Sequence, residues 1–259
     1  MKTQPAPITA LEPFIGKHRV TQGRTLHGTG QRGNGLMRIA VLLTCTCWLL
    51  SAGQAIADVA ARCEFGAFVT ETDPAGLNVR SGPSLAAKVV GRLPPMFPNP
   101  ELNGYLVKVE VDVLSSRSGW FEIANAQDHE ALTDRPARRT FHGTGWVSGR
   151  KLSVKSQARK GYARPDRKSP VVFSLADGKS FDSDVFVEAG QLVACSGKWA
   201  LVEFDRSKIS ADDIQSLKVE PVAQVGVSQG RFRAWISRIC NIQETTCSGL
   251  GGDEPQPPR

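Results

Sequence analysis

The segment Gly76–Ser84 (GLNVRSGPS) limits the possible folds of this chain more than any other feature. Its apolar residues Leu77 and Val79 are two positions apart and alternate with polar residues, so one face of a strand is apolar and the other is wet. A Gly-Pro pair follows at once. Glycine tolerates positive φ and proline cannot donate a ladder hydrogen bond, so the strand must end there. A short strand that stops at a tight turn is typical of a protein made mainly of β-structure.

The same alternation returns further along the chain. Leu106–Val113 places valine at every second position, which predicts one strand with Lys108 on its wet face. The apolar segment Asp184–Glu188 is expected to open a strand that leads to Cys195. Ile209–Leu217 instead predicts a short helix, with Ser210 as its N-cap.

The second half of the chain repeats the order of the first. In each half, two apolar strands are followed by two segments that each contain a tryptophan, in the same order. Four of the five tryptophans therefore occupy matching positions in the two halves. A repeat of this size predicts two tandem domains rather than a short-period solenoid. The polar segment Ser153–Lys160 is expected to be the linker between them. The matched positions are Trp120 with Trp199, Trp146 with Trp235, and Asn78–Ser81 with Tyr162–Pro165.

Three motifs resemble the bacterial Src-homology-3-type (SH3b) domain: the Leu77–Pro83 opening, the Gly119–Trp120 strand and the closing Gly143–Val147. The resemblance implies two small SH3b-like β-barrels, at residues 63–155 and 160–247. The second copy departs from the pattern, because it lacks the Ser-Gly-Pro turn and has a longer stretch between its tryptophans. Closing a small sheet into a barrel would remove its exposed edges.

The first 57 residues indicate a leader with a signal peptide. Residues 39–50 form a compact apolar h-region, which is too short to cross a bilayer as a helix, so no transmembrane anchor is expected. Met37 is the expected start, and Ala55–Ala57 fits a cleavage site. Cys45 stands in a weak lipoprotein-like context, and we interpret it as part of the h-region. The mature chain is therefore expected to be exported, to the periplasm or the outside.

Net charge argues against a nucleic-acid role. The chain carries +7 overall, but the leader holds six basic residues against one acidic residue and so accounts for most of the excess. A basic pI that arises from a removed leader does not indicate a nucleic-acid-binding surface on the mature protein. The Gly- and Pro-rich tail, residues 249–259, is expected to be disordered.

Four cysteines remain after the leader, and an even number in an exported chain favours disulfides. They allow three connectivities. A local Cys240–Cys247 bridge would leave Cys63 and Cys195 to join the two halves. The alternative, a four-cysteine zinc site, lacks the closely spaced pairs that such sites use, so we expect no metal.

Catalytic groups are sparse in the mature chain. Its histidines, His129 and His142, lie outside any motif, and Cys195 is expected to be paired, so we expect neither an enzyme nor a cofactor. The candidate ligand-binding residues are Arg80, Phe97, Tyr105 and Trp120.

Each candidate has a structural alternative. Arg80 can hold a ligand carboxylate or pack against a tryptophan, and Phe97 can face a ligand groove or close one end of the barrel. The basic residues Arg135, Arg138 and Arg139 suit an anionic polymer, but a solvated loop fits them better.

The expected function is that of a non-catalytic exported binding module that contacts peptidoglycan or its peptide stems in the cell envelope. One alternative is a periplasmic protein–protein adaptor or inhibitor, with an envelope protein as partner. A weaker alternative is a cell-wall-modifying enzyme.

Overall fold

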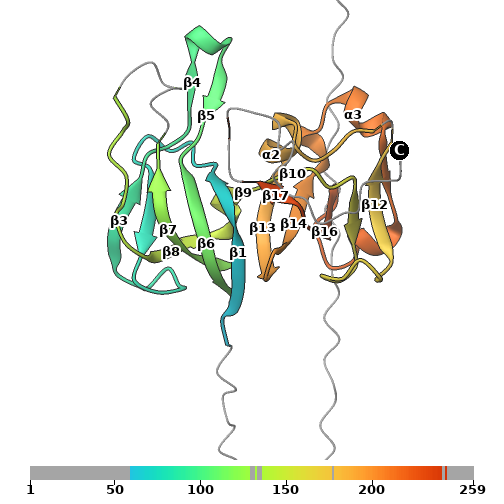
Figure 1. Ribbon diagram of the computed structural model, residues 1–259, viewed down its shortest axis with the longest axis horizontal. Coiled ribbons are helices and arrows are strands. Elements are labelled where there is room, and N and C mark those ends of the chain that lie inside the picture. Colours follow the sequence, from blue (N-terminus) through green and yellow to red (C-terminus); the bar gives the residue numbers. More distant parts are fainter. Residues whose placement is uncertain (1–58, 129–131, 133–135, 177, 241–242, 244–259) are drawn as a thin grey trace, which may run out of the picture. The chain divides into compact units, whose positions relative to one another are not determined.

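Two large antiparallel sheets dominate the computed structural model, and each is built from a consecutive stretch of the chain (Figure 1). The structure describes residues 59–128, 132, 136–176, 178–240 and 243. The expectations for the leader and Met37, for Cys247 and for the tail lie outside these residues. Among the described residues, no helix is long and apolar enough to cross a membrane.

The first sheet has seven strands in the order β3-β2-β8-β7-β6-β1-β9. Its strands alternate buried and exposed positions, as the valine pattern predicted, so one face packs on a core and the other does not. The strands are β1 (Ala61–Val69), β2 (Leu77–Arg80), β3 (Val89–Leu93), β6 (Glu110–Arg117), β7 (Trp120–Gln127), β8 (Gly145–Ser148) and β9 (Leu152–Ser153).

The second sheet has six strands in the order β13-β14-β16-β11-β12-β15. Five of them repeat the connectivity of the first sheet, because β11, β12, β13, β14 and β16 take the places of β2, β3, β6, β7 and β8. The strands are β11 (Lys160–Tyr162), β12 (Val171–Leu175), β13 (Gly190–Ser196), β14 (Trp199–Asp205), β15 (Leu217–Val219) and β16 (Arg231–Ile236).

Short elements complete the fold. The hairpin of β4 (Phe97–Asn99) with β5 (Tyr105–Val107) precedes β6, and β10 (Lys155–Ser156) pairs with β17 (Ile239–Cys240). The α-helices are α2 (Asp184–Ala189) and α3 (Ala211–Gln215), and the 3₁₀ helices are η1 (Pro100–Leu102), η2 (Gly149–Lys151), η3 (Arg206–Lys208) and η4 (Pro221–Gln224). The Ser210 hydroxyl caps α3 by accepting from the Asp213 amide, so the helix predicted there is confirmed.

Aromatic packing fills the core beneath the second sheet. Phe173, Phe181, Phe204 and Phe232 are each at most 2% exposed and contact one another edge-on or stacked, with ring centroids 4.6–5.9 Å apart. The same cluster continues beneath the first sheet, where it is built mainly from valine, leucine and isoleucine, with Phe121. The described part of the chain is therefore mainly β, with apolar cores that the alternating strands cover.

The hydrogen-bond ladders of the two large sheets do not close. In the first sheet β3 and β9 remain as edges, and in the second the edges are β13 and β15. No closed barrel is therefore found among the described residues, where the resemblance implied two.

Three local expectations are wrong for one reason, which is packing between distant segments. The strand expected over Leu106–Val113 breaks at Lys108, whose side chain is 1% exposed rather than wet. Asp184–Glu188 lies in helix α2, because its apolar residues also suit the buried face of a helical turn. Ser153 and Ser156 are fully buried in β9 and β10, so the expected linker is part of the packed structure.

The disulfide Cys63–Cys195 joins β1 to β13, so this expected pairing is confirmed. Backbone hydrogen bonds flank the disulfide. The Glu64 amide donates to the Gly197 carbonyl (2.9 Å), and the Gly197 amide donates to the Arg62 carbonyl (2.8 Å). Cys240 is also disulfide-bonded. Such bonds are compatible with an oxidising, exported location.

Candidate functional site

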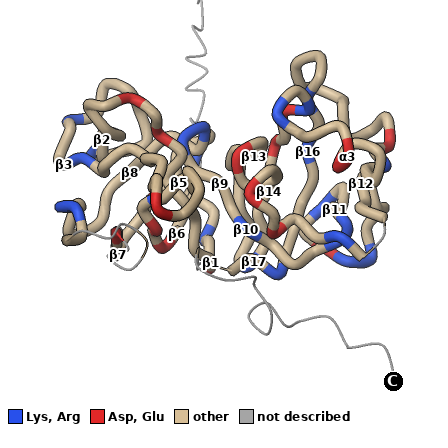
Figure 2. The backbone as a smooth tube through the Cα atoms, turned by 90° about the horizontal axis from the view of Figure 1, so that it is seen from above, with Lys and Arg blue, Asp and Glu red and all other residues tan. Residues whose placement is uncertain are grey.

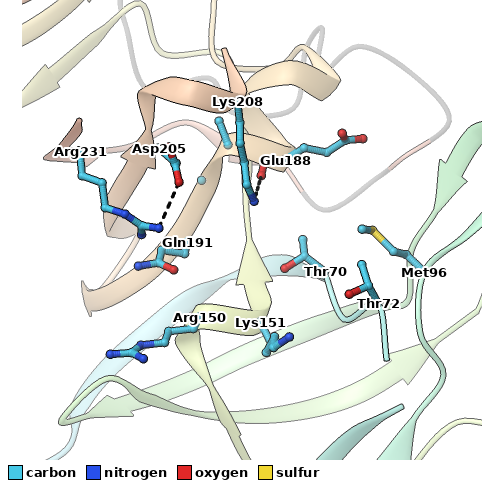
Figure 3. Close-up of a pocket in the computed structure, with 12 residues that line it drawn as sticks. Thr70, Thr72, Met96, Arg150, Lys151, Glu188, Gln191, Asp205, Lys208 and Arg231 are labelled. Carbon is cyan, nitrogen blue, oxygen red and sulfur yellow. Dashed lines mark hydrogen bonds and ion pairs between the residues drawn. The ribbon is translucent and has the colours of Figure 1, made fainter. Parts of the chain in front are cut away.

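A polar cavity of about 500 Å³ lies where segments from both stretches of chain meet (Figure 3). Its wall contains four cationic side chains and two carboxylates, and a methionine supplies most of its apolar character. The residues that line it are Thr70, Thr72, Met96, Arg150, Lys151, Glu188, Ala189, Gly190, Gln191, Asp205, Lys208 and Arg231.

Gly149 brings the two sides of the cavity together. A Cβ atom at this position would stand 2.3 Å from the Leu192 carbonyl oxygen of β13 and 2.4 Å from the Phe121 ring. Only glycine therefore permits this close approach of η2 to β13. The approach places Arg150 and Lys151 across from Gln191.

Glu71 organises the neighbouring wall. Its carboxylate accepts hydrogen bonds from the amides of Thr72 (2.9 Å) and Asp73 (3.0 Å) and from Lys151 Nζ (2.8 Å). Its backbone carbonyl accepts from the Met96 amide (2.8 Å). Burial raises the pKa of Glu71, but the hydrogen bonds from Lys151, Asp73 and Thr72 outweigh burial and leave the pKa below its usual value. Glu71 is therefore a carboxylate at neutral pH and neutralises Lys151.

A second network holds the opposite wall. Arg231 contacts Asp205 (3.1 Å) and Glu203 (3.2 Å), and Arg233 contacts Glu203 (2.8 Å). Hydrogen bonds from Ser207, with the charges of Arg231 and Lys208 in support, lower the pKa of Asp205 although partial burial opposes this. Gln191 also donates to Glu203 (3.0 Å). Both terminal nitrogens of Arg231 thus contact carboxylates within the protein.

Arg150 and Lys208 are different. Among the described residues neither forms an ion pair, and Lys208 Nζ donates only to the Glu188 backbone carbonyl at 3.3 Å. Both residues are exposed, and Figure 3 shows them on different sides of the cavity, Lys208 beside Glu188 and Arg150 beside Lys151. Figure 2 shows charged residues of both signs interspersed along the described chain.

A buried lysine, Lys108, contacts Glu188 but does not itself line the cavity. Lys108 Nζ donates to the Leu106 carbonyl (2.8 Å), lies 3.8 Å from the Glu188 carboxylate and sits 5.3 Å from the centre of the Tyr105 ring. Burial lowers the pKa of Lys108, and the charges of Glu188 and Asp184 partly counter this. Tyr105, a predicted ligand residue, is thus committed to a structural contact.

The remaining predicted residues are also engaged or lie elsewhere. Arg80 donates to the carbonyls of Leu85 (2.9 Å) and Ala87 (2.8 Å) in the turn that follows β2, and it lies opposite Trp146. Phe97 lies under the Arg138 guanidinium, 4.6 Å from ring centre to Cζ. Arg138 in turn forms an ion pair with Asp128 at 2.6 Å, so it is no solvated loop residue.

The structure does not bring the four predicted residues into one surface. Phe97 and Tyr105 share the β4–β5 hairpin, which enters β6 at Glu110. Trp120 lies at the other end of the β6–β7 pair, opposite Arg117, roughly 24 Å away at the usual strand rise of 3.4 Å per residue. None of the four lines the cavity. No local pattern marks its cations, since they become neighbours only when η2, η3 and β13 pack.

The described residues contain no group of three or more His, Cys, Asp or Glu side chains that could hold a metal ion. Cys195 is in a disulfide and has no free thiol for nucleophilic chemistry. The arrangement can bind an anion through two available cations. Comparison of the chain with known protein families, curated proteins and solved structures finds no match.

Proposed function

We propose that this chain is a non-catalytic, exported binding protein of the cell envelope that holds peptidoglycan by the carboxylates of its peptide stems, in the cavity of Figure 3. One observation carries the proposal: Arg150 and Lys208 are the cavity cations that form no ion pair with a carboxylate of the described residues. A carboxylate supplies the acceptor that both lack, and such charge-assisted hydrogen bonds are among the stronger polar contacts.

The rest of the wall suits a peptide. Thr70, Thr72 and Gln191 offer groups that can both donate and accept hydrogen bonds with amides, and Met96 offers an adaptable apolar contact. Glu188 is half-exposed, and its carboxylate, which lies 3.8 Å from Lys108 Nζ, has acceptor capacity left for an amine, as a stem with a diamino acid would present. A short peptide with free carboxylates and an amine therefore matches the cavity in charge and polarity.

The same proposal treats the two halves as tandem copies of an SH3b-like module. The shared order of five strands in the two sheets supports it, as does the repeated spacing of the tryptophans. The cavity then lies between copies rather than within one, which explains why the motifs of a single copy do not reveal it.

Calorimetric titration with a soluble stem peptide tests this function. We expect binding by the wild-type chain, and a loss of about tenfold or more in affinity in each of Arg150→Ala and Lys208→Ala, since a hydrogen bond to a charged group contributes about 1.5–3 kcal/mol. The variant Lys168→Ala removes an exposed lysine remote from the cavity wall and should bind as the wild type does.

Amidation of the peptide carboxylates should weaken binding as much as the variants do. If stem peptide fails to bind, or binds equally well to Arg150→Ala and Lys208→Ala, the proposed function is wrong. Co-purification of one envelope protein, with indifference to cell wall, would instead favour the adaptor alternative.

A further inference from the structure

The two tryptophan pairs occupy equivalent places in the two sheets. In the first sheet Glu122 of β7 lies opposite Trp146, and Trp120 precedes Glu122 by two residues. In the second sheet Leu201 of β14 lies opposite Trp235, and Trp199 precedes Leu201 by two residues. Each pair is therefore diagonal on two neighbouring strands, a separation that aromatic side chains can span.

Both pairs face away from the apolar cores. Their chain neighbours Phe121, Val147, Ala200 and Ile236 are at most 1% exposed, whereas all four tryptophans are only half-buried. Because successive side chains of a strand point to opposite faces, the indoles lie on the outer faces of the sheets. Their N–H groups have no hydrogen-bond partner among the described residues, and none of them is buried away from solvent.

In each sheet the strand next to the pair, β2 or β11, contributes a further side chain. Arg80 lies opposite Trp146, and Tyr162 lies opposite Trp235. Tyr162 also meets Trp199 edge-on, with ring centroids 5.6 Å apart and planes at 86°. The charged groups beside the first pair are engaged within the protein, because Arg80 donates to carbonyls of its own turn and Glu122 accepts from the Ser115 hydroxyl (2.9 Å). Leu201 and Tyr162, beside the second pair, carry no charge. These surroundings favour a neutral ligand.

The position of the pairs within the sheets limits the class of ligand further. All four tryptophans lie on β7, β8, β14 and β16, each of which has a hydrogen-bonded strand on both sides. A peptide therefore cannot add to them as a further strand. The ligand must lie flat on a sheet face, where it meets indole rings and free N–H donors. A pyranose ring fits, since its C–H face can stack on the electron-rich ring face and its hydroxyls accept from indole N–H.

We propose that the Trp120–Trp146 and Trp199–Trp235 pairs are two equivalent saccharide subsites that bind repeats of one glycan strand. This inference rests on the proposed function, whose cavity takes the peptide stems, and it assigns the sugar backbone to a different surface. Two like subsites suit a ligand that presents the same unit repeatedly, because linked binding events raise the overall affinity without new contacts.

Titration with a β-1,4-linked N-acetylglucosamine tetramer tests the inference, because this probe carries neither carboxylate nor peptide. We expect two equivalents bound per wild-type chain, one in each of Trp146→Ala and Trp235→Ala, and none in the double variant. On a long glycan strand either single variant should lose about 100-fold in affinity, as linkage is lost. Indole fluorescence, to which these four residues contribute, should shift on binding.

Matched variants separate folding from recognition. Trp146→Phe and Trp235→Phe keep an aromatic ring, so their melting temperatures should stay close to the wild-type value. They should also reduce the affinity for the tetramer less than the alanine variants do. Absence of tetramer binding, a single equivalent in the wild type, or unchanged binding by the double variant would each overturn the inference.

The two proposals fail separately. Arg150→Ala with Lys208→Ala should bind the tetramer normally, because both residues belong to the cavity. Stem-peptide binding without tetramer binding removes only the saccharide subsites. Tetramer binding at two sites without stem-peptide binding removes only the cavity assignment.

Discussion

Single residues decide where charge remains available in this protein. Glu71 neutralises Lys151, and Arg231 is held by Asp205 and Glu203, so that most cavity charges are satisfied internally. Arg150 and Lys208 are left for a ligand. Residue types alone do not show this difference, because it depends on which partners the fold brings within reach.

Glu71 gives a prediction with a defined sign. Its pKa is lowered in the folded chain, so the unfolded chain binds more protons near that pKa, and stability falls as pH drops through it. We expect Glu71→Gln to destabilise the protein by about 1–2 kcal/mol at pH 7, as the charged hydrogen bonds are lost. Thermal unfolding at a series of pH values should show the variant and wild type converging in acid. A constant difference down to pH 2–3, which is roughly two units below the usual carboxyl pKa, would contradict this assignment.

Elements come together through close backbone approach. The approach of η2 to β13 at Gly149 allows Arg150 and Lys151 to join the cavity wall, and the Leu192 carbonyl occupies the space that a side chain would need. The helix α2 likewise brings Glu188 to the cavity and covers Lys108. The geometry of the cavity is thus a property of contacts between elements.

Gly149→Ala tests this role. The added methyl group must push η2 from β13, which we expect to cost about 1–3 kcal/mol of folding stability and to weaken stem-peptide binding as well. Gly82→Ala is the matched control, because a Cβ there meets only Ala87 at an ordinary 3.7 Å. Unfolding in urea and the stem-peptide titration measure the two effects. Equal stability of both variants would show that η2 has room to move.

At the scale of the whole molecule, the Cys63–Cys195 disulfide ties β1 to β13 across a sequence separation of 132 residues. Closing so long a loop restricts the unfolded chain strongly, which is the usual account of stabilisation by a disulfide. The buried segment from Ser153 to Ser156 adds packing between the same stretches of chain. Both sheets accordingly belong to one compact unit.

The double variant Cys63→Ser/Cys195→Ser should therefore lose about 2–5 kcal/mol of stability. Thermal unfolding without reductant is the measurement, and the expected result is a clearly lower melting temperature with a far-ultraviolet spectrum that keeps its β-signature. An unchanged melting temperature would show that noncovalent packing alone determines the stability of the unit.

Local alternation in the sequence determined much of the fold. The alternating patterns placed β2 and the first half of β6 correctly but missed the break at Lys108. Ser210 marked the start of α3, and the spacing of the tryptophans anticipated their equivalent registers. One detail differs: the residue opposite Trp235 is Tyr162, which therefore matches Arg80 rather than Asn78. Strand bulges near Arg80 and Tyr162 shift local pairings in a way that a linear comparison does not detect.

The sequence by itself thus determined many of the strands and the repeated tryptophan positions, because each follows from the chemistry of neighbouring residues. It left three cysteine connectivities open, and the structure decided the Cys63–Cys195 pair. Only the tertiary structure decided that Lys108 is buried, that Asp184–Glu188 is helical and that a cavity forms around Arg150 and Lys208. These properties depend on which distant segments pack together. Contacts between distant segments leave no periodic pattern in the sequence from which they could be predicted.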